Sequence, residues 1–312
     1  MGAGPLMRVI HTGQALVDVV VRIEELPERG GNSMASTRQH FAAGAVTILL
    51  AAARAGAHAV HAGAVGTGQN GDLIRAVLAA DGVEVSSPPV EGMDTGICVV
   101  AVEATGERTF ITTMEAERHV TADSLATSGP APGDLVCVTG YSLFEPTRDP
   151  LLTFLESLDD GVTVVLDPGD AFATMPWEVR RRMLAVTDVW TSNSTEAWDL
   201  TGEGDVEAAT AALAETLGAG AVVVVRDGPG GCWVRLDGVT THVPGFPQEP
   251  VDTNGAGDAH TGVLVAERTL GTDWLEAARR ANAAGAIQVT RWGPSSAPTR
   301  AEVDAFLAER QA

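Results

Sequence analysis

The sequence predicts an α/β fold in which a central, mostly parallel sheet is flanked by helices on both faces. Two observations support this prediction. In the middle of the chain, apolar strand-like runs alternate with helical patterns, as in a series of βαβ units. These strand runs contain few polar residues, which is typical of parallel strands buried on both faces. Because 45% of the 312 residues are hydrophobic, the chain can bury a large core. We therefore expect a single domain over residues 1–312.

The N-terminal part is expected to start the main sheet and to add a smaller one. Strands are predicted over residues 8–13, 17–23, 33–39, 95–102 and 108–113, and the last two form a hairpin. An alanine-rich segment, residues 41–54, predicts a helix. The short strands outside the main alternation predict a small β-sheet formed by about residues 15–40 and 94–118.

The remaining elements follow from the same patterns. The expected strands are 58–65, 135–139, 162–167, 188–191, 221–225 and 232–235. The expected helices are 72–80, about 149–158, 274–290 and 300–310, and three further helices are expected to start at Trp177, at Glu196 and near Gly257.

Composition excludes several classes of protein. The formal charge is −21, which argues against nucleic acid or an anionic membrane surface as a partner. All 20 basic side chains are arginine, so a Walker A loop and a Schiff-base lysine are both excluded. Cys98, Cys137 and Cys232 lie far apart in apolar runs and are expected in the core. The chain start lacks the features of a signal peptide, and we expect a cytoplasmic protein.

One stretch, residues 251–262, carries the strongest indication of chemistry. Gly255, Ala256 and Gly257 leave backbone N–H groups uncovered just before a predicted helix. A helix N-terminus with free amides binds anions such as phosphate. Asp258 falls in the first turn, where it could accept a proton from a hydroxyl group beside that phosphate. A simple helix-start role for Asp258 would produce the same local pattern.

The segment from Asp252 to Asp258 reads D-T-N-G-A-G-D and resembles the D-T-x-G-A-G-D signature of the ribokinase-like (PfkB-type) carbohydrate kinases. The resemblance implies a ribokinase-like three-layer sandwich with a small β-sheet lid. It implies transfer of the γ-phosphoryl group of ATP, with Mg²⁺, to a hydroxymethyl group of a sugar or nucleoside. By resemblance, Asp258 is the catalytic base, and Gly255, Ala256 and Gly257 form the anion hole. Asp252 would hold a monovalent cation such as K⁺.

The resemblance also assigns an acceptor site, with one departure from the family. Asp18, a single acid inside an apolar run, would bind sugar hydroxyls, although an isolated acid can also be a turn residue. The family reads G-G-x-x-x-N before the first helix, whereas this chain has Ala42, Ala43 and Thr47 at the three defining positions. Thr47 and the intervening Gly44 are predicted substrate-binding residues. The added methyl groups and the lost amide leave the identity of the acceptor open.

The nucleotide site is predicted from three segments. Asn193 and Glu196 match the family's N-x-x-E motif, which organises Mg²⁺ through water, but the same residues could form a helix capping box. Arg226 could reach a phosphate or pair with an acid at the surface. The other predicted nucleotide-binding residues are Gly228, Gly231 and Asn282.

Two alternative functions follow from other features. Gly66, Gly68 and Gly71 form a G-x-G-x-x-G pattern after a strand, with Glu84 downstream, which would suit a dinucleotide-dependent oxidoreductase. The replacement of the family's glycine pair by Ala42 and Ala43 would suit a binding or regulatory protein that keeps the fold but catalyses no reaction. In the family the lid can pair with a second subunit, so a homodimer through the lid sheet is a further expectation.

Overall fold

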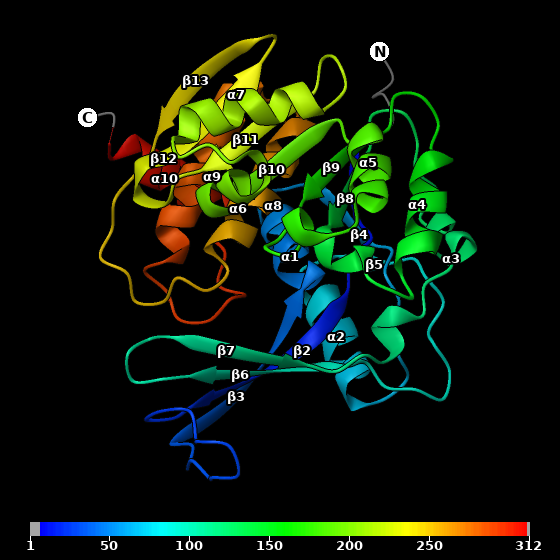
Figure 1. Ribbon diagram of the computed structural model, residues 1–312, viewed down its shortest axis with the longest axis vertical. Helices are drawn as coiled ribbons and strands as arrows, with labels where there is room; N and C mark the ends of the chain where they lie inside the picture. The colour runs from blue at the N-terminus through cyan, green and yellow to red at the C-terminus, as the bar shows by residue number, and fades with distance from the viewer. Residues whose placement is uncertain (1–6, 311–312) are drawn as a thin grey trace.

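The computed structural model describes residues 7–310. Its main sheet contains nine strands in the order β13-β12-β11-β10-β9-β8-β1-β4-β5 (Figure 1). The strands are β1 (Arg8–His11), β4 (His58–His61), β5 (Glu84–Val85), β8 (Leu135–Thr139), β9 (Thr163–Asp167), β10 (Val189–Asn193), β11 (Val222–Arg226), β12 (Gly231–Leu236) and β13 (Val239–Pro244). All neighbours pair in parallel except β11 with β12 and β12 with β13.

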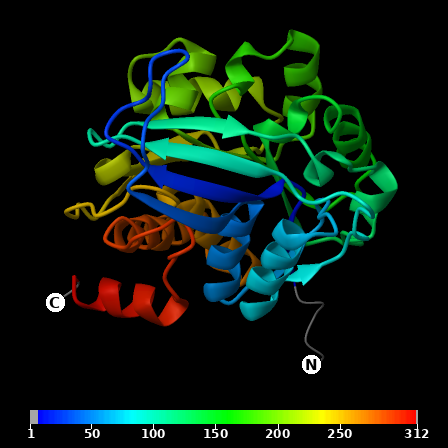
Figure 2. The ribbon, with the colours of Figure 1, turned by 90° about the horizontal axis from the view of Figure 1, so that it is seen from below.

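Helices cover both faces of this sheet, which confirms the predicted three-layer α/β architecture (Figure 2). One face is covered by α3 (Ala122–Ala126), α4 (Arg148–Glu156), α5 (Trp177–Ala185), α6 (Ser194–Thr201) and α7 (Val206–Thr216). The other is covered by α1 (Ala45–Arg54), α2 (Gln69–Ala80), α8 (Ala256–Thr269), α9 (Trp274–Gln288) and α10 (Arg300–Ala308). Short 3₁₀ helices occupy Ala116–Arg118, Gly140–Leu143, Phe172–Thr174 and Gly228–Gly230. Between residues 7 and 310, no helix has the length and apolar character needed to cross a bilayer.

A separate four-stranded sheet, called the lid sheet here, projects from one end of the molecule (Figure 1). Its strands are β3 (Thr37–Gly44), β2 (Ala15–Arg22), β6 (Ile97–Val102) and β7 (Arg108–Thr112), in that order. The strands β2 and β6 are parallel, and the other two pairs are antiparallel. The second segment of the lid sheet, residues 97–112, lies inside the predicted range 94–118, whereas the first, residues 15–44, extends beyond the predicted end at about residue 40.

The start of the first helix differs from the prediction. Residues 41–44 are the end of β3, and helix α1 begins at Ala45. The alanine-rich sequence favours a helix, but Ala42 and Ala43 pair with Val17 and Leu16 of β2, and these ladder contacts override local propensity. The elements α3, α7 and β13 lie where no element was predicted.

A close approach of α1 and α8 brings two distant segments of the site together. Gly262 in α8 lies directly against α1, and a Cβ atom there would come within 2.4 Å of the Ile48 carbonyl oxygen. Only glycine fits this contact without moving a helix. The start of α8 is thereby held beside the start of α1.

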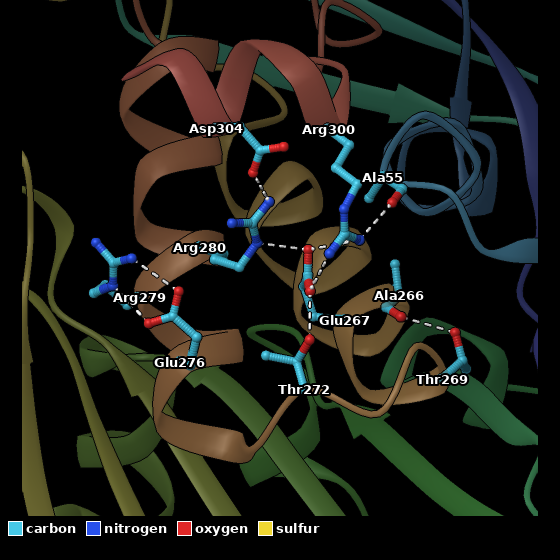
Figure 3. A network of polar contacts seen from close by, with 10 residues as sticks. All are labelled: Ala55, Ala266, Glu267, Thr269, Thr272, Glu276, Arg279, Arg280, Arg300 and Asp304. Carbon is cyan, nitrogen blue, oxygen red and sulfur yellow. Dashed lines mark hydrogen bonds and ion pairs between the residues drawn. The ribbon is translucent and has the colours of Figure 1, made fainter. Parts of the chain in front are cut away.

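The far end of α8 is held by a buried ionic network (Figure 3). Glu267 is 1% exposed and accepts hydrogen bonds from the Arg280 Nε at 2.7 Å and from the Thr272 hydroxyl at 2.6 Å. Arg300 of α10 also donates to Glu267, at 3.1 Å, and to the Ala55 carbonyl. These groups come from α8, α9, α10 and the end of α1. The network therefore fixes α8, which begins at the glycine turn, relative to its neighbouring helices.

Candidate active site

The predicted site residues gather where the parallel strands end and α8 begins. This is the usual position for a ligand in an open α/β sheet. Gly255 adopts the left-handed conformation, with φ 77°, and a Cβ atom there would lie 2.4 Å from the Pro294 carbonyl oxygen. Ala256 and Gly257 are the first residues of α8. Within residues 7–310, the N–H groups of Gly255 and Gly257 have no protein acceptor, so both are available to an anion.

Asp258 lies in the first turn of α8 and contacts Thr47 of α1. The Thr47 hydroxyl is 2.7 Å from Asp258 Oδ2 and 2.7 Å from the Gly44 carbonyl oxygen, so its one proton can serve either acceptor. Burial raises the pKa of Asp258 to about 6, although the Thr47 hydrogen bond lowers it. Thr47 therefore contacts both Asp258 and the start of its own helix, and its substrate-binding role stays a prediction.

Asp18 projects from the middle of β2 and lies near enough to Asp258 for their charges to interact. Burial is the main cause that raises the pKa of Asp18 to about 7, and the Asp258 carboxylate adds to it. The strand pairing places Ala43 on the same face of the lid sheet as Asp18, because Ala43 pairs with Leu16. Ala42 pairs with Val17 and packs in the core on the opposite face. Only one of the two alanines can therefore shape a pocket at Asp18.

The Arg226 side chain points into the protein and not toward Asp227, the acid that follows it in the sequence. Its guanidinium donates to Thr191 at 2.8 Å and to Thr261 at 3.0 Å, and lies 3.3 Å from Asp167 Oδ2. The Glu196 carboxylate is 3.9 Å away. Arg226 thus bridges the ends of several strands beneath the start of α8 and partly neutralises the carboxylates around it.

Asn193 and Glu196 form the capping box of α6. The Asn193 side chain accepts from the Glu196 N–H at 2.8 Å, and the Glu196 carboxylate accepts from the Asn193 N–H at 2.9 Å. Burial, followed by the nearby Asp167 carboxylate, raises the pKa of Glu196 to about 7. One Glu196 oxygen is used by the cap, which leaves the other for a cation or its water.

A cavity of about 460 Å³ lies on one side of the glycine turn. It is lined by the predicted residues Asn193, Arg226, Gly228, Gly231, Ala256, Gly257 and Asn282. The Asn282 amide is already engaged, because it donates to the Val243 and Pro244 carbonyls and its oxygen lies 3.1 Å from His260 Nε2. Asn282 therefore shapes the cavity wall rather than offering a free donor.

Asp252 lies on the other side of the turn and is held by three groups. Its carboxylate accepts from the N–H groups of Asn254, at 2.9 Å, and Gly293, at 3.1 Å. Arg108, from strand β7 of the lid sheet, lies 3.5 Å from Asp252 Oδ1 and donates to the Thr253 hydroxyl at 3.0 Å. A guanidinium of the lid therefore neutralises the carboxylate that was predicted to hold a monovalent cation.

Several residues of the site were not predicted from the sequence. Asp167 ends β9, one of the parallel strands whose carboxyl ends form the edge where α/β sheets bind ligands, and this position was the signal that could have identified it. No local sequence motif marked the remaining residues, which are the partners of the Arg226 guanidinium, the lid residue Arg108 and the cavity residue His260.

The Gly66 loop offers no phosphate site of the dinucleotide type. The Asp94 carboxylate accepts from the N–H groups of Asn70 and Gly71 at 3.1 and 3.0 Å. A carboxylate of the chain itself thus occupies the helix N-terminus where a dinucleotide phosphate would bind. Glu84 lies in the edge strand β5 and faces His58 at 3.2 Å.

Comparisons with known proteins agree with this geometry. Residues 8–300 match the model described as pfkB family carbohydrate kinase. The chain belongs to this family. It is 32% identical to the uncharacterized sugar kinase YegV of Escherichia coli, over 95% of this chain and 92% of that one. It is 30% identical to the ATP-dependent ribose-1-phosphate kinase of Halopiger xanaduensis, over 98% and 99% of the two chains.

Solved structures confirm the fold of this pfkB family member. Arabidopsis thaliana ribokinase, whose structure holds ribose and ATP, is 25% identical and superposes with a TM-score of 0.80, covering 96% of this chain and 98% of the other. The predicted ribokinase-like fold is therefore confirmed, and the protein is a sugar kinase that uses ATP. The names of these relatives give different acceptors, ribose 1-phosphate for the Halopiger protein and ribose for the Arabidopsis protein.

Proposed function

We propose that the protein transfers the γ-phosphoryl group of ATP to a hydroxymethyl group of a sugar or nucleoside, with Asp258 as the base. The observation that carries this proposal is the position of Asp258, whose carboxyl lies in the first turn of α8 directly after the uncovered amides of Gly255 and Gly257. A base and an anion-binding turn on one helix start can serve the attacking oxygen and the transferred group together.

In the proposed reaction, the acceptor hydroxyl loses its proton to Asp258 as its oxygen attacks the γ-phosphorus. A new O–P bond forms, the bond to the β–γ bridging oxygen breaks, and ADP leaves. The free N–H groups of Gly255 and Gly257 stabilise charge on the transferred group, whereas the Ala256 N–H, which was also predicted to be free, donates to the Thr253 carbonyl at 3.4 Å. Asp18 holds other hydroxyl groups of the acceptor, and Thr47 orients the Asp258 carboxylate through their hydrogen bond.

The residues at the cavity suit ATP with Mg²⁺. The 460 Å³ cavity adjoins Gly257 and Arg226 and is large enough for a nucleoside. Glu196 and Asp167 offer carboxylate oxygens, the ligand type that Mg²⁺ prefers, and Asn193 and Glu196 would hold it through water. When bound, Mg²⁺ supplies charge neutralisation at the phosphates. Arg226 already offsets part of the negative charge of these carboxylates.

Three further expectations stay predictions: K⁺ at Asp252, a cytoplasmic location and a homodimer through the lid sheet. The edge strand β7 of that sheet carries Phe110 and Ile111, which are 59% and 67% exposed. An open edge with exposed apolar side chains favours pairing with a second copy. Sedimentation of the wild type and of Ile111→Glu would test the dimer, because only a lid-mediated dimer would be weakened by that change.

The function is tested by measuring ADP release with a panel of acceptors. The panel contains ribose, fructose, ribose 1-phosphate and adenosine, and each acceptor is tested with the wild type and with Asp258→Asn. We expect acceptor-dependent ADP release and product phosphorylation that require Asp258. If ATP and a sugar both raise the melting temperature but no product forms, the protein is instead a binding or regulatory member of the fold.

A further inference from the structure

The outer end of the lid sheet carries two arginines on the face that bears Asp18. Asp18 and Arg22 are four residues apart on β2, so their side chains project from the same face. Arg22 pairs with Val102 of β6, and Val102 pairs with Arg108 of β7. Arg22 and Arg108 therefore lie in one cross-strand row, and both can contact whatever lies opposite this face.

The two arginines make different contacts outside the lid sheet. The Arg22 guanidinium lies over the Trp292 ring, with its carbon 4.2 Å from the ring centre. Arg108 instead lies 3.5 Å from Asp252 Oδ1 and donates to the Thr253 hydroxyl at 3.0 Å. Of the two arginines, Arg108 is therefore the one joined to the segment that runs directly into the glycine turn.

A cavity of about 590 Å³ between the lid sheet and residues 250–254 is lined by both arginines and by two carboxylates. Glu103, which follows β6, accepts from the Leu26 N–H at 3.0 Å and so joins two parts of the lid. Asp252, from the loop before α8, is only 12% exposed, so water screens its charge poorly. The pair of Arg108 and Asp252 therefore forms an ionic contact across this cavity, from the lid sheet to the loop.

Asp252 connects this contact to the glycine turn. Its carboxylate accepts from the N–H groups of Asn254 at 2.9 Å and Gly293 at 3.1 Å. The buried Gln288 amide joins the same two loops, because it donates to the carbonyl oxygens of Asn254 and Gly293 at 3.1 and 2.9 Å. Gly255 follows Asn254 directly, so the position of these two loops sets the direction of its free N–H group.

We propose that Arg108 is a positioning residue for phosphoryl transfer, which acts through Asp252 to aim the free N–H groups of Gly255 and Gly257 at the transferred group. This inference rests on the proposed kinase function. Donors of this kind accelerate a reaction only when they are already in place, and a displacement of about 1 Å can cost about 10²-fold in rate. Because Asp18 lies on the same sheet as Arg108, the acceptor and the anion hole are joined through the lid.

The test compares wild type, Arg108→Gln and Arg108→Lys with whichever of ribose, fructose, ribose 1-phosphate and adenosine gives the highest kcat/KM. Arg108→Gln should lower kcat by about 10- to 100-fold, while the Kd for ATP stays near that of wild type. Arg108→Lys should recover part of kcat, because it keeps the charge but has fewer donors. The matched control is Arg38→Gln: the exposed Arg38 pairs with Val21, so it projects from the opposite face of the lid sheet, and kcat should not change.

The response to cations tests whether Arg108 acts through Asp252. Without the guanidinium, the Asp252 carboxylate keeps its negative charge and can attract a small cation from solution. The ratio of kcat in K⁺ to kcat in tetramethylammonium should therefore be higher for Arg108→Gln than for wild type, and this increase should vanish in the double variant Arg108→Gln/Asp252→Ala. The losses in kcat should be non-additive, since both changes break one contact. Additive losses with an unchanged ratio would overturn the action through Asp252.

Amide hydrogen exchange over residues 250–260 gives a measurement that needs no acceptor. Exchange should be faster in Arg108→Gln than in Arg38→Gln, because the loop before α8 loses its contact with the lid. Folded Arg108→Gln with wild-type kcat and exchange would overturn this inference and leave the kinase function standing. If wild type turns over none of the acceptors, the proposed function is overturned, and equal exchange in the two variants would overturn the role of Arg108 as well.

Discussion

The Thr47 hydroxyl lies 2.7 Å from Asp258 Oδ2, although the two residues are 211 positions apart in the chain. This contact joins the first turn of α1 to the first turn of α8. It gives the otherwise buried Asp258 carboxylate a hydrogen-bond donor, which favours its ionised form. Thr47, a predicted substrate-binding residue, thereby contacts the proposed base directly.

Loss of the Asp258 carboxylate should abolish turnover. Asp258→Asn is expected to lower kcat by about 10² to 10⁴, because the amide cannot accept the hydroxyl proton. Since burial raises the pKa of Asp258 to about 6 and the base must be ionised, wild-type kcat/KM should fall as pH drops below about 6. Steady-state rates from pH 5 to 8 check this, with ATP binding measured separately. A variant that keeps a tenth of wild-type turnover would remove Asp258 from the role of base.

Loss of the Thr47 hydroxyl should move this pH profile. Thr47→Val removes the donor that lowers the pKa of Asp258, so the acidic limb of kcat/KM should shift to higher pH. Thr47→Ser keeps the hydroxyl and serves as the control, with its limb near the wild-type position. An unshifted limb in folded Thr47→Val would mean that Thr47 serves only its own helix through the Gly44 carbonyl.

Removal of Asp252 should disorder the glycine turn without unfolding the protein. The carboxylate binds the N–H groups of Asn254 and Gly293 on the two loops around the turn, so Asp252→Ala should lower kcat while the melting temperature stays close to that of wild type. Activity in K⁺ should also exceed activity in tetramethylammonium. Equal rates in both salts would show that the Arg108 guanidinium is the only cation needed at this carboxylate.

Asp18 should make the ligand-free protein less stable at higher pH. Its pKa is raised from 3.8 to about 7, so the protonated form is favoured by folding: this contribution is present below about pH 4 and is lost as pH rises through 7. Asp18→Asn should therefore unfold at a higher temperature than wild type at pH 8, with a smaller difference at pH 4. Thermal unfolding at both values checks the sign, and a difference that grows toward pH 4 would contradict it.

Glu267 should be a major contributor to stability. Glu267→Ala removes the buried carboxylate that Arg280 and Arg300 share, while Arg280 keeps Asp304 and the 40% exposed Arg300 keeps access to water. The loss of these charged hydrogen bonds should cost about 1.5 to 3 kcal/mol of unfolding free energy. Glu178→Ala removes an exposed carboxylate paired with Arg181 and is the control, with unfolding expected at the wild-type midpoint. Urea unfolding of both variants measures the difference. A midpoint for Glu267→Ala equal to that of the control would show that the network is dispensable.

Local sequence was sufficient for those features that a short segment creates by itself. The alternation of apolar strands and helices predicted the α/β architecture, because burial on both faces leaves parallel strands almost wholly apolar. The run from Gly255 to Asp258 predicted a helix start with free amides, since glycine conformation and helix geometry are local. The capping box of Asn193 and Glu196 was predicted for the same reason.

Only the tertiary structure decided how distant groups combine. Residues 41–44 joined β3 because pairing with β2 outweighed their helical propensity. The inward turn of Arg226 toward Asp167 and the placement of Arg22 beside Trp292 depend on strands and loops far apart in the chain. Hydrogen bonds and ion pairs depend on distance in space. Spacing along the sequence does not give that distance, because crossover connections and the lid sheet bring together residues that are far apart in the chain.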